Sequence, residues 1–226
     1  MAAPKAHTRL SETVYERLKQ DIFEFRLLPG DRLTETELAD TLKVSRTPVR
    51  QALHRLEQEG YLKLAFRNGW NVLPFDFDRF EQLYDLRIII ELAAIQQICD
   101  AETAADLGEL AAVWLVPASE RLADARTVSE NDEAFHQGLV LATGNGEMAR
   151  VHRDISEKIR IIRRLDFTKG ERINATYDEH AQILRLLTQR KAAQAAILMR
   201  SHISASKAEV RKITLHMLHV ARQKAR

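Results

Sequence analysis

The sequence predicts a mainly α-helical protein, in which an N-terminal winged helix-turn-helix is followed by an all-α bundle of six or seven helices. Three observations support this prediction. Apolar residues recur at steps of three and four along most of the chain, which is the spacing of one helix face. The β-forming residues and a hairpin turn gather in one short stretch, residues 61–74. The 226 residues are 45% hydrophobic, enough for two cores, so we expect domains at residues 1–75 and 76–226.

The first helix is expected to follow a disordered start at residues 1–8. Ser11 or Thr13 is a suitable first residue. The apolar side chains that then line one face are Val14, Leu18, Ile22 and Phe25. Residues 27–31 contain a Pro-Gly pair, which is typical of turns, so we expect the helix to end before them.

Two short helices joined by a tight turn are predicted in residues 34–60. Thr34 and Glu37 have the spacing of a capping box, in which two side chains satisfy amides at the start of a helix. Ser45 is a second N-cap candidate, and Pro48 falls in the first turn of the following helix, where a proline costs little. One apolar stripe of this second helix consists of Val49, Ala52, Leu53 and Leu56.

A β-hairpin is predicted directly after the second helix. Residues 61–66 alternate and contain β-forming side chains, Asn68-Gly69 is a strong turn signal, and residues 70–73 supply the returning strand. Helix, turn, helix and hairpin in this order make a winged helix-turn-helix. The wing tip holds Arg67, Asn68 and Gly69, which are suited to contact a phosphate or to enter the minor groove of DNA.

The second helix carries a candidate DNA-reading face. Its N-terminal turns place Arg46, Thr47, Arg50 and Gln51 opposite the apolar stripe. Arginine can pair bidentately with guanine and hydroxyl groups can hold phosphates, so this helix is suited to the major groove. The alternative is an ordinary solvated basic face. The formal net charge of the whole chain is only +2, so DNA affinity has to come from the local placement of charge.

The segment from Leu28 to Leu62 contains PGDRL, ELA, VSRTPVRQAL and LEQEGYL in this order, and it resembles the DNA-binding domain of GntR-family bacterial transcriptional regulators. The resemblance covers most of residues 10–75. It implies a set of DNA-contacting residues: Arg46, Thr47 and Arg50 on the second helix, and Arg67, Asn68 and Gly69 in the wing. Thr36, which we add to this set, stands where some members carry an arginine, so the operator sequence stays open.

After a link at residues 74–76, the rest of the chain is expected to be helical. A long helix to about Asp100 is predicted by the spacing of Leu83, Leu86, Ile90, Ala94 and Ile98. Further helix starts are expected at Thr103, Pro117, Ser129, Asn145 and Thr176. Lys169-Gly170 is a predicted helix stop. Because no convincing strand follows Thr103, we expect an all-α bundle.

Four polar residues in this region have the pattern of a metal site. Asp132 and His136 lie four residues apart, so they share one face of a helix, and His180 and His202 fall on two further predicted helices. One carboxylate and three imidazoles suit a divalent ion such as Zn²⁺, Ni²⁺ or Mn²⁺. The alternative is a chance alignment, since the chain has eight histidines. His152 is expected on a charged surface, with a second-shell role as the alternative.

The segments YDLRIIIE, NDEAFHQGLVLATGN, DEHAQILRLL and AAQAAILMRSHI resemble the FCD effector domain of the FadR-type GntR subfamily, over roughly residues 78–210. The metal ligands that this resemblance implies are Asp132, His136, His180 and His202. It also implies a small organic acid as effector. Arg87 is a candidate to bind that acid, and the alternative is an ion pair between Arg87 and Glu91. Further candidates, most of them expected at the surface, are Arg160, Arg163, Arg164 and Arg172.

These observations together predict a ligand-responsive transcriptional regulator that is not an enzyme. We expect a homodimer that binds palindromic double-stranded operator DNA and senses a small carboxylate metabolite at the metal-containing site. Two alternatives remain, a metal-dependent hydrolase-type enzyme and a purely structural metal. A single cysteine, Cys99, and the lack of a long apolar run or signal peptide lead us to expect a cytoplasmic protein without membrane contact. The effector, the native metal, the operator and the direction of regulation stay open.

Overall fold

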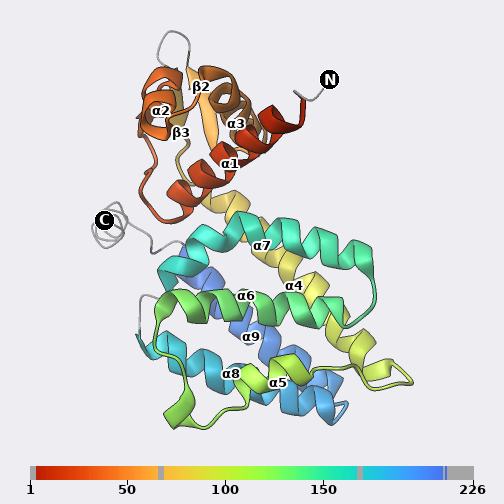
Figure 1. The fold of residues 1–226 in the computed structure, drawn as a ribbon. Coiled ribbons are helices and arrows are strands. Elements are labelled where there is room, and N and C mark those ends of the chain that lie inside the picture. Colours follow the sequence, from red (N-terminus) through yellow and green to blue (C-terminus); the bar gives the residue numbers. More distant parts are fainter. Residues whose placement is uncertain (1–3, 66–68, 167–169, 211, 213–226) are drawn as a thin grey trace. The chain divides into compact units, whose positions relative to one another are not determined.

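The computed structural model describes residues 4–65, 69–166, 170–210 and 212 (Figure 1). The chain divides into two compact units, one reaching to Asp76 and one running from Phe77 to Lys212. Both units are mainly helical, and within the described residues the strands all belong to the first unit. The predicted fold class, a winged helix-turn-helix followed by an all-α bundle, is confirmed.

The N-terminal unit combines helices with a small antiparallel sheet. Its elements are α1 (Pro4–Phe23), β1 (Arg32–Leu33), α2 (Glu35–Leu42), α3 (Arg46–Gln58), β2 (Leu62–Ala65) and β3 (Gly69–Val72). β3 lies between β1 and β2, with Trp70 opposite Leu33 on one side and Leu64 on the other. The hairpin was predicted from the sequence. β1 was not, because two residues are too few to show an alternating pattern.

The helix boundaries of this unit follow from local side chains and backbone angles. The Thr34 hydroxyl accepts a hydrogen bond from the Glu37 amide (3.2 Å) and donates one to the Glu37 carboxylate (2.6 Å), so the predicted cap of α2 is present. Ser45 precedes α3 in an extended conformation, but its side chain makes no capping hydrogen bond. α2 ends at Leu42, and the next residue, Lys43, has a left-handed φ of 55°. The start predicted for α1 is wrong, since the helix already begins at Pro4.

The core of the N-terminal unit forms where α1 packs on α3. Every apolar residue that defined the two predicted faces is at most 6% exposed: Val14, Leu18, Ile22, Phe25, Val49, Ala52, Leu53 and Leu56. Gly69 has a structural role of its own. Its φ is +74°, and a Cβ atom added there would lie 2.6 Å from the Leu33 carbonyl oxygen, so a side chain at this position would clash with β1.

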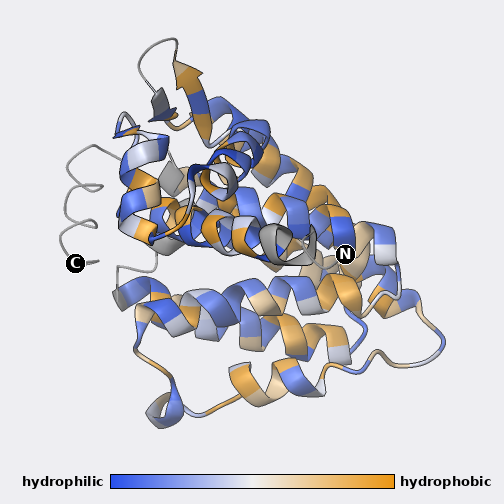
Figure 2. Cartoon of the chain, turned by 45° about the horizontal axis from the view of Figure 1, so that its top comes forward, coloured by the Kyte–Doolittle hydropathy of each residue, from blue (hydrophilic) through white to orange (hydrophobic). Residues whose placement is uncertain are grey.

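The C-terminal unit is a helical bundle. Its elements are α4 (Phe77–Asp100), α5 (Gly108–Trp114), the 3₁₀ turn η1 (Ala118–Glu120), α6 (Ala125–Leu141), α7 (Gly146–Asp166), α8 (Gly170–Thr188) and α9 (Ala192–Val210). α4 packs along α9 and α7, α6 packs on α7, and α8 packs on α9. Figure 2 shows hydrophobic and hydrophilic residues sharing each long helix, as expected when one face lies inside a bundle. Among the described helices, none is both long enough and apolar enough to span a membrane.

Of the predicted helix starts in this unit, the one at Asn145 is confirmed. α7 begins one residue later, and the Asn145 side chain accepts a hydrogen bond from the Met148 amide at 3.0 Å. α6 instead begins at Ala125, where Asp124 caps the helix, so Ser129 lies inside the helix and is buried.

Three other boundary predictions are wrong. α5 begins at Gly108 rather than at Thr103, and Pro117 precedes only the short 3₁₀ turn. α8 begins at Gly170, so Thr176 lies within it, where its hydroxyl donates to the Arg172 carbonyl oxygen at 2.9 Å. The predicted stop at Lys169-Gly170 is not tested, because α7 ends at Asp166, α8 begins at Gly170, and residues 167–169 between them lie outside the described residues.

Candidate metal centre and DNA-reading surface

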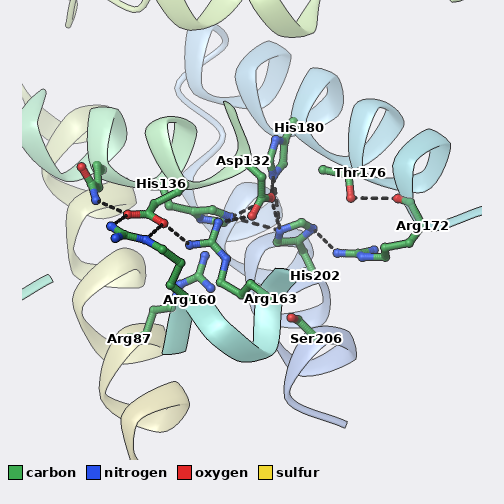
Figure 3. A network of polar contacts seen from close by, with 12 residues as sticks. Arg87, Asp132, His136, Arg160, Arg163, Arg172, Thr176, His180, His202 and Ser206 are labelled. Atoms are coloured by element: carbon green, nitrogen blue, oxygen red, sulfur yellow. Dashed lines mark hydrogen bonds and ion pairs between the residues drawn. The ribbon is translucent and has the colours of Figure 1, made fainter. Parts of the chain in front are cut away.

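Three helices of the C-terminal unit bring four polar side chains together. Asp132 and His136 lie on one face of α6, His180 on α8 and His202 on α9, and each is at most 3% exposed. One possible ligand atom from each residue lies within 4.8 Å of the other three. Figure 3 shows the four side chains converging, and we call them the metal-site cluster. The sequence spacing predicted the α6 pair, and the packing of the bundle adds the other two.

The distances within the metal-site cluster suit a single ion. His202 Nε2 lies 3.1 Å from His136 Nε2 and 3.2 Å from His180 Nε2. Asp132 Oδ1 lies 3.3 Å, 3.6 Å and 3.8 Å from the Nε2 atoms of His180, His136 and His202, respectively. Ligands at about 2.0–2.2 Å from a tetrahedral or octahedral ion are separated from one another by roughly 3.0–3.5 Å. Three of the five distances fall in this range and the other two exceed it by at most 0.3 Å, so the four atoms lie close to the spacing of ligands around one ion.

The hydrogen bonding of the cluster also fits a cation. Asp132 Oδ1 is buried and makes no hydrogen bond with any described residue. A buried acceptor left in this way costs about 1–3 kcal/mol. His202 Nε2 faces the Nε2 atoms of both His136 and His180, although a neutral imidazole nitrogen is either a donor or an acceptor. A divalent ion at the centre would use the Asp132 oxygen and all three nitrogen lone pairs at once.

Two glutamates hold the outer nitrogens of the cluster histidines. His136 Nδ1 lies 2.5 Å from Glu91 Oε2, and His202 Nδ1 lies 2.5 Å from Glu179 Oε2. A carboxylate at Nδ1 favours the tautomer that has its proton there, which leaves the Nε2 lone pair directed at the centre. This carboxylate–histidine arrangement is the usual support of histidine metal ligands.

The pKa values of three residues of the cluster favour the protonation states that bind metal. Burial lowers the pKa of His202 to about 4, although Glu179 opposes the shift, and burial holds the pKa of His180 well below its usual value. Burial alone would raise the pKa of Asp132, but the charge of Arg163 and the neighbouring imidazoles hold it well below its usual range. At neutral pH these groups are a carboxylate and neutral imidazoles, as metal ligation requires.

Glu91 on α4 is the centre of a second buried layer. Its carboxylate accepts from Arg87 Nε at 2.6 Å and contacts His152 Nε2 at 3.0 Å, in addition to His136. The predicted alternative for Arg87, an ion pair with Glu91, is therefore present. Arg87 Nη2 is buried and has no hydrogen-bond partner among the described residues, so this arginine keeps one donor available.

The surface position predicted for His152 is wrong, because its side chain is 0% exposed. Its charged sequence neighbours, Arg153 and Asp154, misled the interpretation. A readable signal was present in the helical spacing, since the buried positions of α7 recur at steps of three and four: Ala149, His152, Ser156, Ile159 and Arg163.

Arg163 is the second buried arginine beside the metal-site cluster. It is 2% exposed, pairs with Asp132 through Nη2, and lies 3.9 Å from the Glu133 carboxylate through Nη1. Nη1 makes no hydrogen bond with the described residues. Arg160 and Arg172 are mostly covered and also carry carboxylate partners, Glu133 and Glu179. Nothing is described for the side chain of Arg164.

The predicted DNA-reading residues lie at the surface of the N-terminal unit. Thr36 on α2 and Arg46, Thr47 and Arg50 on α3 are all exposed, and we call them the DNA-reading surface. Both arginines contact Glu35, a residue that the sequence interpretation did not single out. Of the predicted wing residues, Gly69 is placed as described above, and Arg67 and Asn68 lie outside the described residues.

Two family models match this chain. Residues 10–72 match the model described as bacterial regulatory proteins, gntR family. Residues 82–205, more than half of the chain, match the model described as the FCD domain. The first match covers the winged unit, and the second covers the helices that carry the metal-site cluster.

Known regulators align with most of the chain. The sequence is 34% identical over 181 residues to the Nta operon transcriptional regulator of Aminobacter aminovorans, which covers 80% of this chain and 84% of that protein. It is 27% identical to the Exu regulon transcriptional regulator of Escherichia coli K12, over 90% of this chain and 83% of that protein. A solved GntR transcriptional regulator from Rhodococcus sp. RHA1 has a TM-score of 0.73 at 21% identity, over 90% of this chain and 98% of that one, and this likeness concerns the fold.

Proposed function

This chain belongs to the gntR family of bacterial regulatory proteins and carries an FCD domain, and from that premise we propose that it controls transcription in response to a metal-bound carboxylate. It is a ligand-responsive transcriptional regulator with a winged DNA-binding unit. In our proposal two copies bind a palindromic operator, and the effector enters the C-terminal unit. The effector has to bind the DNA-competent and DNA-incompetent states with different affinity, since otherwise the equilibrium does not shift.

The observation that carries the proposal is the Asp132 Oδ1 atom, which lies among three converging Nε2 atoms and has no hydrogen-bond partner among the described residues. In our proposal Asp132, His136, His180 and His202 hold a divalent ion, with Zn²⁺, Ni²⁺ and Mn²⁺ as the candidates. Four protein ligands leave coordination positions free on an ion that takes five or six. When bound, the ion would supply a Lewis-acidic site for a carboxylate oxygen.

Two buried arginines support a carboxylate as the effector. Arg87 Nη2 and Arg163 Nη1 have no hydrogen-bond partner among the described residues. Arg87 pairs with Glu91, which supports His136, and Arg163 pairs with Asp132 of the metal-site cluster. Buried guanidinium donors prefer a charged acceptor, and a planar carboxylate matches their geometry. A small organic acid could use the ion and one of these donors at the same time. Aromatic contacts around His180, such as its stacking on Phe135 at 3.7 Å between ring centroids, would keep the site rigid.

A thermal-shift screen tests the proposal. Purified protein is analysed for bound metal and then melted with a panel of small carboxylates, with and without a chelator. We expect one or a few acids to raise Tm only when metal is present, and we expect His180→Ala protein to lose both the metal and the acid response. Protein that contains no divalent metal after growth in metal-supplemented medium, and that responds to acids equally with chelator, would contradict the proposal.

The hydrolase-type alternative has a separate readout. The known proteins that match this chain are named transcriptional regulators, which supports a non-enzymatic role. Turnover of ester or phosphoester substrates by metal-loaded protein, lost in Asp132→Asn, would favour the enzyme instead. A purely structural ion would raise Tm on its own, and no acid would add to that increase.

A further inference from the structure

Glu35 brings the two arginines of the DNA-reading surface together. It is the first residue of α2, and its carboxylate accepts from Arg50 Nε at 2.9 and 3.1 Å and from Arg50 Nη2 at 2.8 Å. Arg46 Nη2 approaches the same carboxylate at 3.3 Å. The Glu35 side chain is 17% exposed, whereas those of Arg46 and Arg50 are 61% and 55% exposed. The glutamate is therefore covered by two arginines that themselves still face solvent.

The Arg50 contact uses only one edge of its guanidinium group. Five N–H bonds lie in a rigid plane, and Glu35 takes the edge formed by Nε and Nη2. Nη1, which forms the other two-donor edge together with the second N–H of Nη2, makes no hydrogen bond with a described residue. Bidentate reading of guanine O6 and N7 needs one such edge in a fixed direction. The ion pair thus restricts the orientation of Arg50 and leaves available the edge that a base would use.

Glu35 also reduces the positive charge of the surface. The hydrogen bond from Arg50 is the largest influence on the pKa of Glu35 and holds it below its usual value, so this group is ionised at neutral pH. Sequence-independent binding of DNA depends on how many phosphates the protein neutralises. One carboxylate between two arginines therefore weakens attraction to any duplex, whatever its sequence.

We propose that Glu35 is a positioning residue that sets sequence specificity, because it orients Arg50 for one base edge and lowers affinity for DNA of other sequences. The proposal rests on the DNA-binding part of the proposed function. In this proposal α2 contributes to base reading through Glu35, and α2 itself does not have to enter the groove. The contribution of an exposed ion pair to folding stability is small, so its loss should change DNA binding without unfolding the protein.

The test is a selection from duplexes with a randomised central segment, using the full-length wild type, Glu35→Gln and Asp40→Asn. Asp40→Asn is the matched control. It makes the same change of charge on the same helix, and the Asp40 side chain is exposed without a partner among the described residues. The dissociation constants for the selected duplex and for a shuffled duplex are then measured at several salt concentrations. Their ratio is the specificity.

For Glu35→Gln we expect affinity for the shuffled duplex to rise by roughly threefold to tenfold. We expect the specificity ratio to fall by about tenfold or more, while Asp40→Asn keeps the wild-type ratio. In an Arg50→Ala background, Glu35→Gln should leave the ratio unchanged, because there is no Arg50 left to orient. If Glu35→Gln melts below the assay temperature, Glu35→Asp replaces it, since its carboxylate is one methylene too short to keep the bidentate contact.

Two results would overturn the inference. One is a specificity ratio in Glu35→Gln equal to that of Asp40→Asn. The other is an equal fall of the specificity ratio when Glu35→Gln is made in the wild type and in the Arg50→Ala variant. A wild-type protein that selects no common sequence would instead contradict DNA reading itself. Failure of the inference and failure of the proposed function are thus distinguishable.

Discussion

The two units use the same chemical pair in opposite environments. Arg50 and Glu35 of the winged unit form an ion pair whose side chains are 55% and 17% exposed, whereas Arg87 and Glu91 of the bundle are 2% and 0% exposed. An exposed pair contributes little to stability, so its loss costs the fold little. A buried pair is expensive to break, because the remaining charge stays in a poorly solvated interior. The winged unit therefore carries its ion pair at little cost to stability, whereas the pair in the bundle is part of a buried and rigid interior.

The largest expected effect comes from breaking the buried pair. Glu91→Ala removes the partner of Arg87, His136 and His152, so we expect the free energy of unfolding of the C-terminal unit to fall by about 3–5 kcal/mol. Urea denaturation followed by tryptophan fluorescence measures this. Glu130→Ala is the control, since it breaks an exposed pair with Arg126 in the same unit and should cost about 0.5 kcal/mol or less. Equal losses in both variants would remove the contrast between the two environments.

The second-largest expected effect is a loss of stability of the bundle as the pH falls. The pKa of His202 is about 4 in the folded state, against about 6.5 in an unfolded chain. Above pH 6.5 both states are neutral and the stability is complete. Between pH 6.5 and 4 only the unfolded state takes up the proton, so stability is lost as the pH falls, by roughly 3 kcal/mol for this residue.

This pH dependence is measured in metal-free protein, so that release of an ion does not contribute. The chain has two tryptophans, Trp70 in the winged unit and Trp114 in the bundle, both buried. Urea transitions of Trp70→Phe protein therefore report on the bundle alone. A bundle that is equally stable at pH 7 and pH 5 would contradict the burial of neutral imidazoles.

A smaller effect is expected from Glu179, which contacts a proposed metal ligand and is not itself a ligand. Glu179→Gln weakens the support of His202 Nδ1 but leaves all four proposed ligands in place, so metal affinity should fall by about tenfold to a hundredfold. Competition with a chromophoric chelator measures the affinity. Asp178→Asn is the neighbouring control, because Asp178 pairs with Arg121 and is 69% exposed, and it should bind metal like the wild type. Indistinguishable affinities would argue against a supporting role for Glu179.

The smallest effect on stability is expected on the DNA-reading surface. Arg46→Ala and Arg50→Ala remove exposed side chains, so each should melt like the wild type. Both should nevertheless abolish the footprint on a selected operator, because they remove base and phosphate contacts. An intact footprint in both variants would show that α3 is not the reading helix.

The local parts of the fold were predictable from the sequence, and the long-range parts were not. Thr34 with Glu37, and Asp132 with His136, are separated by three or four residues, so helix geometry alone relates them. The meeting of Glu91 with His152 depends on how α4 packs against α7, which no spacing within either helix reveals.

Charge patterns were less reliable guides than apolar spacing. The pairing of Arg50 with Glu35 crosses the turn between α2 and α3. It was missed because the two residues are fifteen positions apart and lie on different helices, so spacing within one helix does not relate them. Helix starts were also hard to place. Ser129 has a capping side chain, but α6 begins at Ala125, where the Asp124 carboxylate accepts a hydrogen bond from the Thr127 amide.

The buried carboxylate of Glu91 has a consequence for how this protein can evolve. Three side chains from three helices, Arg87, His136 and His152, depend on it at once. A lineage that loses Glu91 or Arg87 leaves the other with an unbalanced charge inside the bundle, and so passes through a less stable ancestor. Descendants should therefore keep this set intact or replace it as a block, whereas single changes on the DNA-reading surface cost the fold little stability.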